Sequence, residues 1–92
     1  MGYTLVYTDV AREDIERLKK SGDMVAIRKL ARMLEELIDH PFTGSGKPEH
    51  LRYDFSGCWS RRISMKHRLV YQVDDKTVTV NLLSVYGHYD DR

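Results

Sequence analysis

The sequence has little cysteine, little proline and no long apolar run. A single cysteine, Cys58, leaves no partner for an internal disulfide and too few thiolates for a cysteine-ligated metal. No stretch approaches the roughly 20 apolar residues of a membrane-spanning helix. Charged residues begin at Asp9, which is not the pattern of a secretory leader. The 92 residues fit one small domain (1–92), which we expect to act in the cytoplasm.

Apolar spacing predicts a strand followed by two helices. Residues 3–7 alternate and are rich in aromatic and β-branched side chains, as in a strand. Residues 11–18 and 27–37 carry apolar side chains at helical spacing, with Gly22 as a stop between them and Pro41 ending the second helix. The polar residues off the second apolar stripe are Arg28, Lys29, Glu35 and Glu36. The short break predicts a two-helix hairpin.

Strand signals fill the second half of the chain. They cover residues 51–53, 59–63, 68–73 and 77–85. This order predicts an α+β fold: an N-terminal strand and a two-helix hairpin packed on a mostly antiparallel sheet of four to five strands.

Charge is unevenly distributed along the chain, although the net charge is only +1. Residues 47–72 hold six basic and two acidic side chains, whereas the segments on either side are slightly acidic. A basic central segment favours an anionic partner, and the near-neutral total argues against a general nucleic-acid coat protein. A solvated charged face is the alternative that charge alone leaves open.

A tight hairpin after the strand at 59–63 determines which side chains share a face. If Ser64, Met65 and Lys66 form the turn, Arg62 pairs with Arg68 across the two strands. Both arginines then lie on the face away from the helices, and Arg61 falls on the helix-facing side. A two-residue turn would instead separate Arg62 from Arg68.

The glycine-rich segment GSGKPEHL, residues 44–51, is not a nucleotide-binding loop. Such a loop needs an earlier glycine where Pro41 stands, and Ser or Thr where Pro48 stands. It also joins a strand to a helix, the reverse of the order here. The segment instead presents Lys47 and Glu49 near the predicted arginine pair.

These residues form a candidate phosphodiester-cleaving set. Glu49 is the candidate general base for an RNA 2′-hydroxyl, and Arg62 and Arg68 are suited to stabilise a charged phosphate. His88 is the candidate acid for the leaving oxygen, and Tyr89 a candidate for stacking on a base. A metal ion held by the acidic residues and His88 is a weaker hypothesis, because attack by a 2′-hydroxyl needs none.

Several motifs resemble the YoeB (Txe/YoeB) toxins of the RelE superfamily. They are PFTGSGKPEHL (41–51), SGCWSRRI (56–63), HRLVY (67–71) and the terminal GHY (87–89). The resemblance is strong over residues 41–73 and at the C-terminus, whereas residues 1–40 match only in element order. It implies a RelE-like microbial RNase fold.

The resemblance also implies a function: the toxin of a type II toxin–antitoxin system, which cuts mRNA in the ribosomal A site without a metal or other cofactor. It assigns catalysis to Glu49, Arg62, Arg68, His88 and Tyr89. It places Lys47 and Arg52 against the RNA backbone. Arg61 and Lys66, which belong to the same basic segment, are further candidates for RNA binding. The expected partners are mRNA, the 70S ribosome, a YefM/Phd-like antitoxin and a second copy of the chain, with no membrane.

Two other function classes remain open on the sequence. A non-catalytic RNA- or ribosome-binding module would keep the arginines without needing Glu49 and His88. A protein-interaction subunit would use the basic groove for an acidic partner. Only a cleavage measurement separates these classes from the nuclease.

Overall fold

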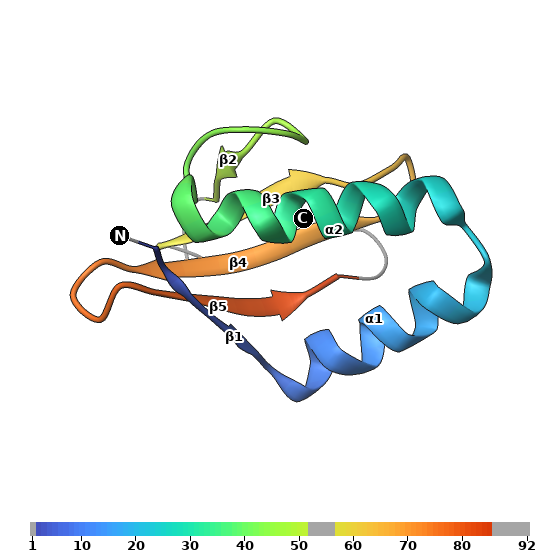
Figure 1. Ribbon diagram of the computed structural model, residues 1–92, viewed down its shortest axis with the longest axis horizontal. Coiled ribbons are helices and arrows are strands. Elements are labelled where there is room, and N and C mark those ends of the chain that lie inside the picture. The colour runs from blue at the N-terminus through green and yellow to red at the C-terminus, as the bar shows by residue number, and fades with distance from the viewer. Residues whose placement is uncertain (1, 52–56, 86–92) are drawn as a thin grey trace.

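The described part of the chain forms one five-stranded sheet with two helices packed on it (Figure 1). The computed structural model describes residues 2–51 and 57–85. The helices are α1 (Asp9–Ser21) and α2 (Met24–Asp39). The strands are β1 (Thr4–Tyr7), β2 (Glu49–His50), β3 (Cys58–Arg62), β4 (Arg68–Asp74) and β5 (Thr79–Ser84). The predicted α+β architecture is confirmed.

The strands lie in the order β1-β5-β4-β3-β2. Only the β1–β5 pair is parallel, and the other three pairs are antiparallel. The N-terminal strand thus lies at one edge and β2 at the other (Figure 1). The loop that follows α2 leads directly into the β2 edge, which places the GSGKPEHL segment beside β3.

Local sequence signals set the helix boundaries. The Thr8 hydroxyl accepts a hydrogen bond from the Ala11 amide at 3.1 Å and caps the start of α1. Gly22 ends α1 in the left-handed conformation (φ 77°), where a side chain would be strained. The Asp23 carboxylate then caps α2 by accepting from the Ala26 amide at 3.1 Å. Neither described helix is long and apolar enough to cross a membrane.

The main core lies between the helices and the sheet. It is built from the apolar faces of both helices and from alternate residues of β4 and β5, such as Leu69, Tyr71 and Leu82. The opposite face of the sheet, which carries Arg62 and Arg68, is not purely polar. A second, small apolar cluster there buries Leu51 and Val70, together with Cys58.

The predicted β3–β4 register is confirmed. Arg62 pairs with Arg68, and the Ile63 amide donates to the His67 carbonyl at 3.0 Å around the tight turn. The strand predicted to begin at Leu51 begins two residues earlier, because Glu49 and His50 already pair with β3. The Leu51 amide still donates to the Cys58 carbonyl at 2.9 Å, and residues 52–53 lie outside the described residues.

A buried carboxylate ties α1 to the end of β5, and its removal is expected to destabilise the fold. Asp14 is 8% exposed, and its Oδ2 accepts a hydrogen bond from the Val85 amide at 3.0 Å. Asp14→Ala leaves that buried amide unpaired, which costs about 1–3 kcal/mol of unfolding free energy in urea denaturation. Asp14→Asn keeps an acceptor and should lose less.

The exposed Asp9 provides the matched control for this prediction. Its side chain is 95% exposed, so Asp9→Ala should change stability by much less. Equal losses for Asp14→Ala and Asp9→Ala would contradict a structural role for the buried carboxylate.

Candidate ribonucleolytic site

The loop between α2 and β2 packs tightly against β3. The Gly46 carbonyl accepts a hydrogen bond from the Arg62 amide at 2.7 Å. Gly46 has φ 82°, and a Cβ there would lie 2.7 Å from the Arg62 carbonyl oxygen and would also strike the Met33 side chain. Only glycine allows so close an approach of the two backbones. The loop therefore enters β2 along one defined path.

Three predicted catalytic residues lie on one face of the sheet, on the neighbouring strands β2, β3 and β4. Glu49 lies opposite Ser60 in the β2–β3 pair, and Arg62 lies opposite Arg68 in the β3–β4 pair. The Arg68 guanidinium approaches the Glu49 carboxylate at 3.9 Å and donates to the Ser60 hydroxyl at 3.4 Å. The Glu49 side chain stays 68% exposed, whereas that of Arg68 is 24% exposed.

Ser60 was missed by the sequence reasoning as a partner of this site. It shares the face of Arg62 and Arg68, and its burial beside Arg68 makes it an orienting contact for the guanidinium. The shared face could be read from the strand alternation, but the contact depends on the Arg68 side-chain conformation.

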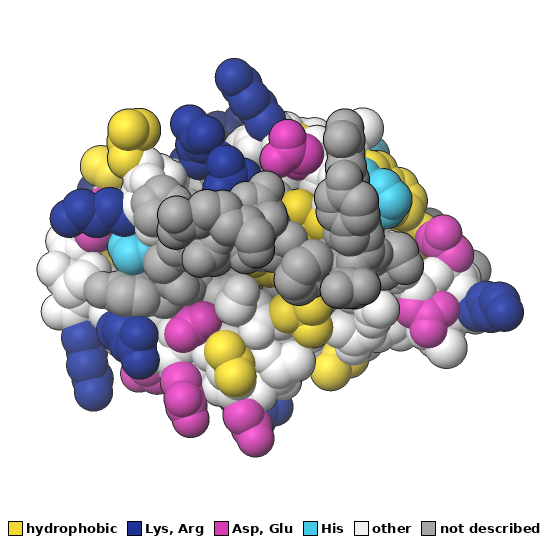
Figure 2. All heavy atoms as spheres, turned by 180° about the vertical axis from the view of Figure 1, so that it is seen from behind, with side chains coloured by type: hydrophobic (Ala, Val, Ile, Leu, Met, Phe, Trp, Pro, Cys, Tyr) yellow, Lys and Arg dark blue, Asp and Glu magenta, His cyan; other side chains and the backbone are white. Residues whose placement is uncertain are grey.

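Further cations surround this group. Lys47 is exposed, two residues before Glu49, and adopts the left-handed backbone conformation (φ 53°). Lys66 is exposed in the turn between β3 and β4. Figure 2 shows Lys and Arg side chains gathered along the same edge of the molecule, with an acidic side chain beside them. Three predicted site residues, Arg52, His88 and Tyr89, lie outside the described residues.

The arrangement has the chemistry to handle a phosphodiester. An exposed carboxylate can accept a proton, and neighbouring guanidinium groups can bind the oxygens of a phosphate. Within residues 2–51 and 57–85, no three His, Cys, Asp or Glu side chains are grouped so as to hold a metal ion.

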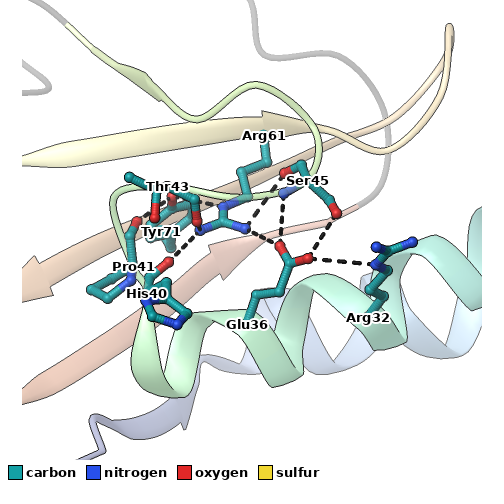
Figure 3. Close-up of polar contacts among 8 residues, drawn as sticks. All are labelled: Arg32, Glu36, His40, Pro41, Thr43, Ser45, Arg61 and Tyr71. Carbon is teal, nitrogen blue, oxygen red and sulfur yellow. Dashed lines mark hydrogen bonds and ion pairs between the residues drawn. The ribbon is translucent and has the colours of Figure 1, made fainter.

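Arg61 does not belong to this surface, and the RNA-binding role predicted for it is wrong. Its side chain is fully buried on the helix-facing side of β3 (Figure 3). The guanidinium donates to the Glu36 carboxylate at 2.8 Å and to the Tyr71 hydroxyl at 3.1 Å. It also donates to three loop carbonyls, those of His40, Thr43 and Ser45, at 2.7, 2.8 and 3.4 Å. With every donor direction used inside the protein, Arg61 has no group left for RNA.

Glu36 and Tyr71 complete this cluster, which we call the Arg61 network (Glu36, Ser45, Arg61 and Tyr71). Ser45 donates to Glu36 through both its amide, at 2.8 Å, and its hydroxyl, at 2.7 Å. The Tyr71 hydroxyl donates to the Pro41 carbonyl at 2.8 Å. Glu36 lies off the apolar stripe of α2, so the stripe alone did not predict a buried contact for it. A buried arginine on the helix side was the signal that a carboxylate had to meet it.

The network shifts two pKa values in opposite directions. Partial burial acts to raise the pKa of the Glu36 carboxyl, but hydrogen bonds from Ser45 and the charge of Arg61 outweigh it, so the pKa is lowered. Burial raises the pKa of the Tyr71 phenol, and contact with Arg61 offsets this only in part. Glu36 is therefore ionised and Tyr71 protonated at neutral pH, as the hydrogen bonds require.

The lowered pKa of Glu36 predicts an acid-sensitive contribution to stability. A carboxyl whose pKa is lower in the folded state stabilises the fold fully above its unfolded value, near 4.5, and loses that contribution as pH falls through the folded value. The stability difference between wild type and Glu36→Gln should therefore shrink from about pH 6 to about pH 3. Urea denaturation across this range checks it, and a difference independent of pH would contradict it.

Comparison with known proteins identifies the family. The family model described as "YoeB-like toxin of bacterial type II toxin-antitoxin system" matches residues 7–89. The chain belongs to the YoeB-like toxins. The toxin RelK of Mycobacterium tuberculosis is 44% identical over 69 residues, which are 75% of this chain and 79% of RelK. The toxin YoeB of Escherichia coli K12 is 41% identical over 58 residues, which are 63% of this chain and 69% of that toxin.

Solved structures share the fold of this YoeB-like toxin. A YoeB/ParE toxin from Agrobacterium tumefaciens superposes with a TM-score of 0.85 at 34% identity, covering 94% of this chain and 99% of that one. A chain of a YoeB–YefM complex from Staphylococcus aureus superposes with a TM-score of 0.78 at 31% identity, covering 95% of this chain and 98% of that one. The chain is thus a toxin of a type II toxin–antitoxin system with a RelE/YoeB-type α+β fold.

Proposed function

We propose that this YoeB-like toxin is an endoribonuclease that cuts mRNA in the ribosomal A site and so inhibits translation. The observation that carries the proposal is the position of the Glu49 carboxylate 3.9 Å from the Arg68 guanidinium, with Arg62 directly across the strand pair from Arg68. These positions support the proposal, because they put a carboxylate and two guanidinium-bearing residues on one face of three neighbouring strands.

The chemistry is attack by the RNA 2′-hydroxyl on the adjacent phosphorus. Glu49 takes the 2′ proton as the new P–O bond forms and the P–O5′ bond breaks. Arg62 and Arg68 stabilise the extra negative charge of the five-coordinate phosphate. His88, assigned through the family motif, supplies a proton to the leaving 5′ oxygen, and Tyr89 stacks on a base. The products are a 2′,3′-cyclic phosphate and a 5′-hydroxyl, and no metal or cofactor takes part.

Exposure of the site supports a requirement for the ribosome. The Glu49 side chain is 68% exposed, so water surrounds the general base in the free toxin. This water weakens the electrostatic interactions between the site and a bound phosphate. Enclosure of the mRNA between toxin and ribosome excludes this water and orients the 2′-hydroxyl. Lys47 and Lys66, both exposed, and Arg52 contribute contacts to the RNA backbone.

The toxin is expected to act in the cytoplasm and to be silenced by a YefM-like antitoxin. One solved relative from Staphylococcus aureus is a complex of YoeB with YefM, and another is a YoeB dimer. We infer that this chain binds an antitoxin of that kind and forms a homodimer. An acidic antitoxin segment laid over Arg62 and Arg68 would block access of RNA to Glu49.

Primer extension on ribosomes stalled with a defined A-site codon tests the nuclease. The toxin is first treated with chelator and desalted, so that any metal it carries is removed without harming the ribosome. New 5′ ends at the A-site codon support the proposal. Intact mRNA on ribosomes that still bind the toxin would instead establish the non-catalytic binding module.

A further inference from the structure

We propose that Glu36 and Arg61 are positioning residues, which hold the α2–β2 loop so that Glu49 meets its substrate. This inference rests on the proposed function, because it concerns the place of the general base. Neither side chain lies on the face of the sheet that carries Glu49, Arg62 and Arg68. Arg61 is fully buried and points to the face of the sheet opposite Glu49 and Arg68.

The contacts of the Arg61 network are directed at the backbone of the loop. Arg61 binds the carbonyls of His40, Thr43 and Ser45, and through the Tyr71 hydroxyl the network also holds the carbonyl of Pro41. Glu36 binds the amide and hydroxyl of Ser45. Figure 3 shows the guanidinium enclosed by the loop, α2 and β4. Charged groups buried for packing alone would be costly, since an apolar side chain could fill the same space.

The short β2 strand explains why Glu49 depends on this loop. β2 has only two residues, Glu49 and His50, and pairs with a single neighbour, β3. So short a strand at a sheet edge has little stability of its own. Its position is therefore set by what precedes it: Ser45 fixed to Glu36, and Gly46 fixed to the Arg62 amide at 2.7 Å.

The network also fixes the position of Glu49 relative to Arg62. Arg61 and Arg62 are consecutive in β3 and point to opposite faces, so the loop is attached to β3 at both residues. Glu49, which ends this loop, and Arg62, whose amide anchors it, therefore move together. Loosening of the loop would change the distance between the base and the phosphate-binding arginines, and a misplacement of about 1 Å can cost about 10²-fold in rate.

The test compares variants by their single-turnover cleavage rate at saturating toxin on stalled ribosomes. At saturation this rate depends neither on affinity nor on the fraction of toxin that is folded, so a purely stabilising role would not alter it. Glu36→Ala is expected to lower the rate by about 10²-fold, and Ser45→Ala, which removes only the hydroxyl contact, should lower it less. Glu36→Gln keeps one acceptor oxygen, which can still accept from the Ser45 amide and from Arg61, and should restore a rate close to wild type.

A stability control and an activity-independent readout accompany the rates. Leu18→Ala creates a cavity in the main core on α1, away from the loop, and should leave the saturating rate unchanged. Amide hydrogen exchange should accelerate at Ser45 and Arg62 in Glu36→Ala but not in Leu18→Ala.

The outcomes separate the two proposals. If wild-type toxin cleaves and Glu36→Ala cleaves at the same saturating rate, the positioning role is overturned while the nuclease stands. Unchanged exchange at Ser45 and Arg62 in Glu36→Ala would also overturn it. Wild-type toxin that binds the ribosome without cleaving would overturn the proposed function, and this role with it.

Discussion

Glu49→Gln is expected to lower the rate constant of mRNA cleavage by about 10²–10⁴-fold, the usual contribution of a general base. The amide has the shape of the carboxylate but cannot accept the 2′ proton. The side chain is 68% exposed and its nearest described ion-pair contact is at 3.9 Å, so the fold should be unaffected. Single-turnover primer extension on stalled ribosomes measures the rate, and ribosome binding should stay close to wild type.

Arg68→Ala and a remote charge variant complete this experiment. Arg68→Ala removes the cation beside Glu49 and should reduce cleavage strongly, because one preorganised charge contact is worth about 10²–10³-fold in rate. Lys76→Ala removes the same charge from an exposed turn between β4 and β5 and should leave cleavage unchanged. If Glu49→Gln cleaved as fast as wild type, the general base would have to be another residue.

The pairing of Arg62 with Arg68 could be predicted because side chains alternate regularly along a strand. Once three residues are assigned to the β3–β4 turn, the alternation of side chains decides the face of every residue in both strands, including Arg62 and Arg68. The helices could be predicted equally well, because the caps at Thr8, Gly22 and Asp23 are local sequence signals.

The start of β2 was not predicted, for the opposite reason. With two residues, it is too short to show a period, and only its pairing with β3 defines it. The proximity of Glu49 to Arg68 likewise depends on how the loop from α2 folds back, which the GSGKPEHL sequence does not reveal.

Arg61 shows how tertiary contacts can overrule composition. The alternation of side chains along β3 correctly placed Arg61 on the helix side, but its membership in a basic segment suggested RNA binding. The residue that decides its role, Glu36, precedes it by 25 positions and lies on another element. An unpaired arginine cannot be buried, so its predicted face already required a carboxylate partner from the helices. Only the structure shows which of the neighbouring acids, Glu35 or Glu36, meets it.

Arg61→Ala is expected to destabilise the toxin by about 3–5 kcal/mol, as removal of one partner of a buried ion pair usually does. The change leaves the Glu36 carboxylate, 22% exposed, without its buried cation and three loop carbonyls without a donor. Since a small domain is stable by only about 5–15 kcal/mol, a large part of its stability would be lost. Urea denaturation measures the loss.

Arg32→Ala is the matched control, because Arg32 pairs with the same carboxylate at 3.5 Å but its side chain is 76% exposed. An exposed ion pair contributes at most about 1 kcal/mol, so the two variants should differ severalfold although each removes one arginine from Glu36. Arg61→Lys keeps the charge but not the planar fork that reaches Glu36, Tyr71 and the loop carbonyls together, and should fall between them. Equal losses for Arg61→Ala and Arg32→Ala would mean that the charge of Glu36, rather than the buried geometry around Arg61, governs the stability of this loop.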